Sequence, residues 1–188
     1  VYTVTVRDRY FEGRYYVPYD KGGASDIEEG WLPNYYVPTD YFINWSEEAV
    51  HRLKTLTLRE RNRQQGKSGG SDKLCSRFQN YSYYFREGIS FSRTGEYCPT
   101  FRRSVKGPFD TEGSMIFVND DSLVISLGLL TSTLLRFLFK AFINHTVHLQ
   151  IEDVKKLPRA VGGDPKIAIL INKIIYKQFE DPRYDYMI

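Results

Sequence analysis

Cysteine, histidine and tryptophan are scarce in this chain. Its 188 residues include two cysteines, three histidines and two tryptophans. Cys75 and Cys98 stand apart and form no CxxC pair, so a zinc site would require these thiols and the histidines to meet by chance in the fold. Isolated thiols of this kind favour a reducing, cytoplasmic setting in which both cysteines are structural.

Long hydrophobic runs are also missing. A helix that crosses a bilayer needs roughly 20 consecutive apolar residues. The densest apolar stretch, residues 123–143, is interrupted by Arg136 and Lys140. We therefore expect buried helices there and no membrane partner.

The motifs of several enzyme classes are absent. The sequence has no GxGxxG, no GxxxxGK[ST] and no nucleophile-elbow spacing. Adenine methyltransferases hold the flipped base with Asn/Asp-Pro-Pro-Tyr/Phe, whereas residues 34–36 (NYY) and 119–121 (NDD) lack the prolines. Residues 153–155 (DVK) match the D-x-K triplet of restriction nucleases, with Asp110 as a distant partner. We expect no catalytic site in this chain itself.

Charge is distributed unevenly along the chain. The net charge is +3, but residues 52–106 contain thirteen cations and four acids, which gives this segment +9 and the remainder −6. A basic segment inside an otherwise acidic chain is expected of a surface that binds a polyanion. A solvated charged surface without a partner is the alternative interpretation.

Periodicity and turn residues predict one mixed α+β domain over residues 1–188. Short strands are predicted at residues 1–6, 14–19, 41–45, 89–92, 97–102, 114–118 and 148–151. The Gly- and Ser-rich residues 64–71 predict an exposed, flexible loop, which is either a connector or a mobile basic arm.

Capping residues place the helices. Ser46 precedes a helix predicted over residues 47–63, Asp120 or Asp121 precedes one ending near residue 130, and Ser132 precedes one ending near residue 143. Asp164 followed by proline starts a last helix. Its predicted apolar stripe consists of Ile167, Leu170, Ile171, Ile174 and Ile175.

A series of segments occurs in a fixed order along the chain. It comprises residues 15–23 (YYVPYDKGG), 41–45 (YFINW), 83–92 (YYFREGISFS), 101–102 (FR), 109–110 (FD), 113–117 (GSMIF), 127–132 (LGLLTS) and 149–158 (LQIEDVKKLP). By order and spacing, the series resembles the target-recognition part of large adenine-specific DNA methyltransferases. Such proteins occur as Type IIG restriction enzymes and as PglX-like methyltransferases of BREX phage-exclusion systems. The resemblance spans roughly residues 14 to 186, and Thr131 replaces an asparagine common in the family.

The resemblance implies sequence-specific recognition of double-stranded DNA in a restriction-modification or phage-defence system. The chain starts at Val1 without methionine, and we interpret it as a fragment of a longer polypeptide. A catalytic methyltransferase domain outside it would use S-adenosylmethionine, and the fragment itself would need no cofactor. In this family the segment around Asp153 is a strand-to-helix turn, so a capping role for Asp153 is preferred over a metal-binding role.

Candidate DNA-binding residues fall into two groups. Side chains suited to base edges lie on or beside the predicted strands: Arg86, Ser90, Ser92, Arg93, Thr94, Arg102, Arg103 and Lys106. Cations suited to phosphates, which fix register without reading sequence, lie elsewhere: Lys21, Arg59, Arg61, Arg63, Lys67, Lys73 and Arg77.

Two other classes of function stay open. Tyr81, Tyr83, Tyr84 and Phe85 would stack on bases in a non-specific, single-stranded or RNA-binding module, although we expect this cluster in the core. The helices of residues 123–143 are expected to form core or interdomain surface. As a docking surface, they would make the chain a protein-interaction domain of the same defence complex.

Overall fold

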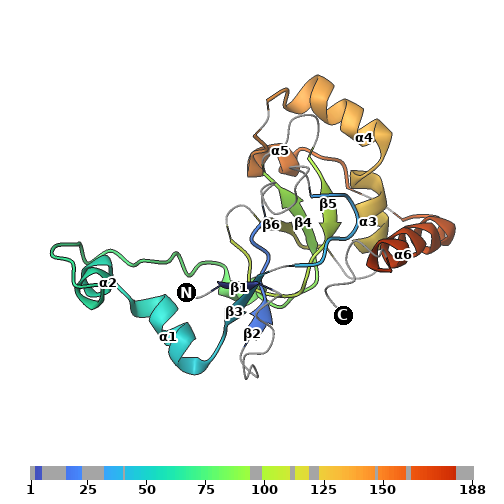
Figure 1. Ribbon diagram of the computed structural model, residues 1–188. Coiled ribbons are helices and arrows are strands. Elements are labelled where there is room, and N and C mark those ends of the chain that lie inside the picture. The colour runs from blue at the N-terminus through green and yellow to red at the C-terminus, as the bar shows by residue number, and fades with distance from the viewer. Residues whose placement is uncertain are drawn as a thin grey trace.

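The structure, a computed structural model, describes residues 3–5, 16–22, 32–39, 41–93, 99–110, 113–118, 123–146, 148–159 and 162–180. Within these ranges two small sheets, a group of helices and a projecting helical arm make up the molecule (Figure 1). The mixed α+β class predicted from the sequence is therefore confirmed.

The first sheet combines segments from the N-terminal part of the chain. Strands β1 (Thr3–Thr5) and β2 (Tyr16–Pro18) flank β3 (Tyr41–Asn44), and both pairings are antiparallel. Three predicted strands are confirmed in this sheet, each within its expected range.

The second sheet has β4 (Ile89–Ser92) at its centre, between β5 (Phe101–Arg103) and β6 (Gly113–Ile116). Both pairings are antiparallel, with Ser90 opposite Arg102 on one side and Met115 on the other. All four residues of β4 are buried. The strand predicted over residues 97–102 begins at Phe101, because residues 99 and 100 are not part of it. Residues 97 and 98 lie outside the described ranges.

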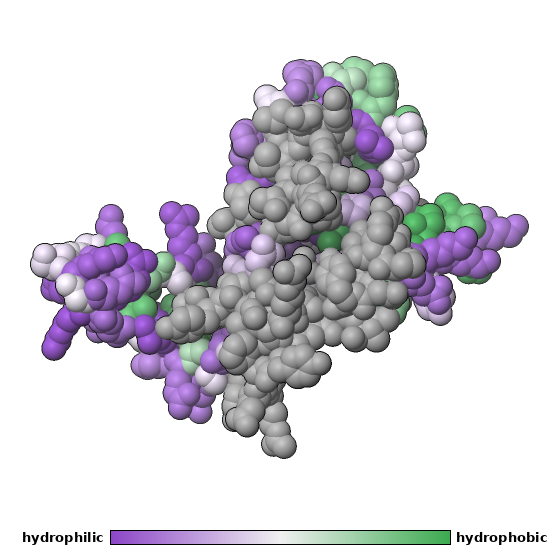
Figure 2. Space-filling model, viewed as in Figure 1, coloured by the Kyte–Doolittle hydropathy of each residue, from purple (hydrophilic) through white to green (hydrophobic). Residues whose placement is uncertain are grey.

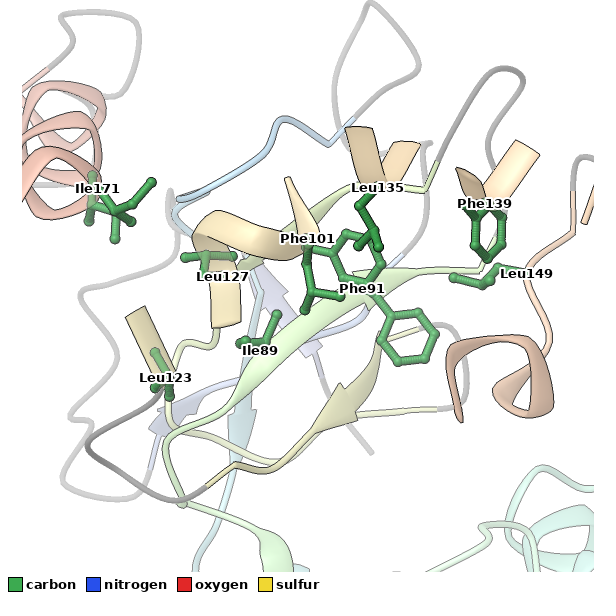
Figure 3. Close-up of a cluster of buried hydrophobic side chains, with 11 residues drawn as sticks. Ile89, Phe91, Phe101, Leu123, Leu127, Leu135, Phe139, Leu149 and Ile171 are labelled. Atoms are coloured by element: carbon green, nitrogen blue, oxygen red, sulfur yellow. The ribbon is translucent and has the colours of Figure 1, made fainter. Parts of the chain in front are cut away.

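Helices pack on the second sheet and form the core with it (Figure 3). They are α3 (Leu123–Leu130), α4 (Thr133–Leu138), the π-helical turn η4 (Phe139–Ile143) that continues α4, and α6 (Pro165–Phe179). The core joins side chains from both layers: Ile89, Phe91, Phe101, Leu123, Leu127, Leu130, Leu135, Phe139, Leu149, Ile171 and Ile175.

Three of the predicted helix starts are confirmed, at Ser46, Ser132 and Asp164. Ser132 Oγ accepts from the Leu135 amide, and the Asp164 carboxylate accepts from the Lys166 amide. Asp120 and Asp121 lie outside the described residues.

The apolar stripe predicted for α6 is only partly correct. Ile171 and Ile175 are buried, whereas Ile167, Leu170 and Ile174 are exposed. Helix α3 approaches α6 closely at Gly128, where an added Cβ would lie 3.2 Å from the Ile171 side chain. This contact covers a narrower strip of α6 than the periodicity of its sequence suggests.

The single helix predicted over residues 47–63 is wrong, because the structure has two. Helix α1 (Glu47–Thr55) begins after its predicted cap Ser46, and α2 (Leu58–Gln64) begins after Thr57. Thr57 and Glu60 form a capping box, in which each side chain binds the backbone amide of the other. The box starts a new helix and leaves Leu56 extended, so the first helix ends there.

Residues 46–79, here called the arm, fold back on themselves. The Leu58 and Arg59 amides donate to Lys73 O and Ser71 O (2.9 and 3.0 Å), and the Cys75 amide donates to Leu56 O (2.8 Å). At Gly70, whose φ is +119°, an added Cβ would lie 2.7 Å from Arg59 Cα, so glycine permits this contact. The loop at residues 64–71 is largely exposed, as predicted, but its return leg is hydrogen-bonded to α2.

The strand predicted at residues 148–151 is wrong, because Ile151 begins helix α5 (Ile151–Lys155). Asp153 explains the helix: its Oδ2 accepts from the Gln150 amide (3.1 Å) and from Asn144 Nδ2 (2.6 Å). The Asn144 hydrogen bond is the main cause of a lowered Asp153 pKa. The preferred interpretation of Asp153 as a capping residue is confirmed.

Candidate nucleic-acid interface

Three of the side chains predicted to read bases lie inside the protein. Arg102 is 3% exposed, and its guanidinium lies 3.3 Å from Asp20 Oδ1 and donates to Ser92 Oγ (3.1 Å). Ser90 and Ser92 are also buried. They alternate along central strand β4 with Ile89 and Phe91, which lie in the core, so the two serines face the opposite side of the sheet, the side on which Arg102 contacts Ser92. The placement of Ser90, Ser92 and Arg102 on a DNA-contacting surface is therefore corrected.

The Asp20–Arg102 pair joins the two halves of the chain. Around it, the Asp20 amide donates to Pro108 O (3.0 Å), and the Tyr35 amide donates to Phe101 O (2.9 Å). The Arg103 amide in turn donates to Tyr35 O (2.8 Å). The backbone of β5 is thus bound to the N-terminal segments, and the buried charges lie at the junction.

Arg103 and Lys106 share one acidic partner. Both form salt bridges with Glu87, the Lys106 Nζ to Glu87 Oε2 distance being 3.0 Å. Partial burial raises the pKa of Glu87, but hydrogen bonds from Lys106 and Arg103 outweigh it and hold that pKa below its ordinary value. Glu87 offsets one of the two positive charges and fixes where both cations lie, while both stay partly exposed.

Arg86 is exposed and lies against two aromatic rings. Its guanidinium carbon is 5.1 Å from the Tyr83 ring centroid and 5.3 Å from that of Phe117. When a guanidinium lies over an aromatic ring, the N–H donors along its edge remain able to bind another group. Arg86 thus combines an exposed side chain with contacts to two rings that limit its movement.

The remaining candidates outside the arm are less accessible or lie elsewhere. Arg93 is half-buried, and its carbonyl accepts from the Leu149 amide (2.7 Å). Thr94 lies outside the described residues. Lys21 lies beside the first sheet, where its Nζ donates to Tyr41 Oη (3.1 Å) and sits over the same ring.

The arm brings together six of the seven cations predicted to contact phosphates. Arg59, Arg61, Arg63, Lys67, Lys73 and Arg77 are all exposed on it. Arg59 is paired with Asp72 at 3.0 Å, and both side chains are well exposed. In Figure 2 the arm projects from the molecule with a mostly hydrophilic surface. Sequence reasoning left Arg52 and Lys54 out of the site, although both belong to the basic segment and lie on α1 of the same arm.

An aromatic cluster lies at the base of the arm, where the sequence predicted core. Tyr81, Tyr83 and Phe85 are exposed, and Tyr84 is half-buried. Trp45, which directly precedes the arm, contacts Tyr84 and Phe85. Phe78, near the end of the arm, contacts Tyr81, whereas Tyr83 contacts Phe117. The expectation that these rings belong to the core is wrong, because the core lies on the other side of β4, under α3 and α4.

Apolar side chains are also exposed on α4 and η4, where Leu134, Phe137 and Phe142 face outward. A docking surface formed by residues 123–143 would require this exposure. No single helix in the described part of the chain is long and apolar enough to cross a membrane. Taken together, however, α3 and the α4–η4 helix, bent by 56°, reach that length and composition.

Among the residues that the structure describes, no three His, Cys, Asp or Glu side chains are arranged to bind a metal ion. Cys75 is a free thiol, and Cys98 lies outside the described ranges. Neither a protein-family model nor a curated protein matches this chain.

Proposed function

We propose that the chain binds double-stranded DNA, with the arm on the phosphate backbone. The observation that carries this proposal is the construction of the arm. Neither of its helices buries a residue, yet the arm displays eight cations against four acids. The arm therefore gains little stability from hydrophobic burial, which is expected if its role is to present a surface to a partner. The net positive charge of that surface favours a polyanion as the partner.

Base reading is proposed for the rim of the second sheet. Arg86 precedes β4, and Arg103 and Lys106 lie on and just after β5. Salt bridges to Glu87 restrict the movement of Arg103 and Lys106. The Tyr83 and Phe117 rings restrict that of Arg86. Restricted cations suit base recognition, because an arginine must approach guanine O6 and N7 in a defined orientation. Ser90, Ser92 and Arg102 have no part in this surface.

The resemblance to adenine-specific methyltransferases makes the proposal more specific. On this basis the chain is the target-recognition domain of a larger cytoplasmic enzyme of a restriction-modification or phage-defence system. The catalytic domain, outside this chain, would bind S-adenosylmethionine and methylate adenine. The arm and the sheet rim would select and hold the duplex for that domain.

Selection from a random duplex library tests the division between reading and positioning. Replacing Arg86 or Arg103 by alanine is expected to cost about 1–3 kcal/mol at one base-pair position, so the enriched sequence loses its preference there. Replacing Arg61 is expected to weaken all sequences about equally, because a phosphate contact carries no base information.

Sequencing of the enriched pools shows which result holds. An unchanged sequence preference after both the Arg86→Ala and the Arg103→Ala replacement would mean that the reading surface lies elsewhere. The Arg61→Ala variant is the matched control, since it removes the same side chain from an exposed site on the arm.

A further inference from the structure

Three aromatic rings at the base of the arm are stacked at small angles. The Phe78 ring lies at 24° to Trp45, with centroids 6.1 Å apart, and at 22° to Tyr81, with centroids 5.9 Å apart. Trp45 follows β3 and directly precedes the arm, and Phe78 lies near the end of the arm's return leg. Tyr81 begins the short 3-10 helix η2 (Tyr81–Tyr83) that follows.

Edge-on rings fix this arrangement. Tyr84 meets Phe78 at 83° and Trp45 at 72°, and Phe85 meets Trp45 at 80°. Offset-stacked and edge-to-face pairs are the favourable geometries for aromatic rings. Phe78 and Trp45 are therefore held in place from the side, and Phe78 in turn supports the Tyr81 ring.

Tyr81 itself is 66% exposed, so most of its surface has no protein cover. Lys54 Nζ lies 5.0 Å from the Phe78 centroid and 5.9 Å from the Tyr81 centroid. Arg77, next to Phe78 in the chain, is also exposed. An exposed ring on a rigid aromatic support, with cations beside it, combines the two features by which proteins bind unpaired nucleotides.

We infer that Tyr81 stacks on an unpaired base of DNA and that Lys54 contacts a phosphate next to that base. The inference rests on the proposed function and adds a second mode of contact to it. A base inside a fully paired duplex is covered by its neighbours on both faces and offers no free face to Tyr81. A bulged or single-stranded base offers one.

Two DNA probes of equal length test the inference, a fully paired duplex and the same duplex with one bulged 2-aminopurine. Stacking on Tyr81 is expected to quench the 2-aminopurine fluorescence. Tyr81→Ala should abolish the quenching and weaken binding of the bulged probe by about 5- to 150-fold, the range for loss of one stacked base. Binding of the paired duplex should change by no more than about twofold, because that duplex presents no unpaired base.

Two variants serve as controls. Tyr81→Trp should retain both the quenching and the affinity, because a larger ring stacks at least as well. Tyr176→Ala removes a tyrosine of similar exposure, 61%, from helix α6 and should leave both probes unaffected. Unfolding in urea confirms that each variant is folded.

The outcomes separate this inference from the proposed function. If the wild-type chain binds paired duplex but Tyr81→Ala leaves the bulged probe equally bound and quenched, the stacking site is refuted and duplex binding stands. If the wild-type chain binds neither probe at low salt, both proposals fail. Loss of binding to both probes in Tyr81→Ala, with the fold intact, would also refute a site specific for unpaired bases.

Discussion

Replacing Arg61, Arg63 and Lys67 together by alanine is expected to make duplex-DNA binding much less dependent on salt. Each neutralised phosphate contributes about −0.9 to the slope of log affinity against log salt, so three lost contacts reduce the slope by about 2.7. The fold should persist, since all three side chains are exposed and neither helix of the arm buries a residue. Fluorescence anisotropy over a range of salt concentrations gives both slopes.

Helix α6 provides a matched control for this experiment. Replacing its exposed lysines, Lys166, Lys173 and Lys177, by alanine removes the same formal charge from a helix on the opposite side of the molecule (Figure 1). The slope should then stay at the wild-type value. An equal decrease in both triple variants would show that net charge, and not the arm, governs binding.

Replacing Arg102 by alanine is expected to lower the free energy of unfolding by about 3–5 kcal/mol. Arg102 and Asp20 are both buried, and the alanine would leave the Asp20 carboxylate uncompensated inside the protein. The loss is large because a buried charge without its partner cannot regain the hydration that it gave up on folding. Urea unfolding of the wild-type chain and the variant measures the difference.

Two comparisons make the Arg102 experiment specific. Arg103→Ala breaks a more exposed pair on the same strand and is expected to cost only about 0–1 kcal/mol. Adding Asp20→Asn to Arg102→Ala removes the unpaired charge and should restore part of the lost stability. Equal losses for Arg102→Ala and Arg103→Ala would contradict a structural role of the buried pair.

Local signals in the sequence account for most of the fold that was predicted correctly. Ser46, Ser132 and Asp164 cap helices where the sequence places them. The helix break at Thr57 was also readable, because Thr57 and Glu60 have the spacing of a capping box. However, apolar residues continue at helical spacing on both sides of Thr57, and this pattern led to the prediction of a single helix over residues 47–63.

Burial within the candidate site was not predictable in the same way. Arg102 meets Asp20, which lies 82 residues away in the chain, so no local pattern identifies the pair. Ser90 and Ser92 are small polar residues that suit an exposed strand, but β4 is central and the face that carries them is closed by the Arg102–Asp20 pair. The sequence also predicted that the aromatic cluster of Tyr81, Tyr83, Tyr84 and Phe85 belongs to the core. Local sequence cannot show where in the fold the core forms, so this prediction was wrong.

The affinity of the wild-type chain for duplex DNA, measured from low to physiological salt, tests the central claim most directly. The basic arm predicts tight binding at low salt and a steep, linear fall of log affinity with log salt, by about 0.9 for each phosphate contacted. Binding that is absent at low salt, or that stays constant as salt rises, would contradict a role for the arm in binding nucleic acid.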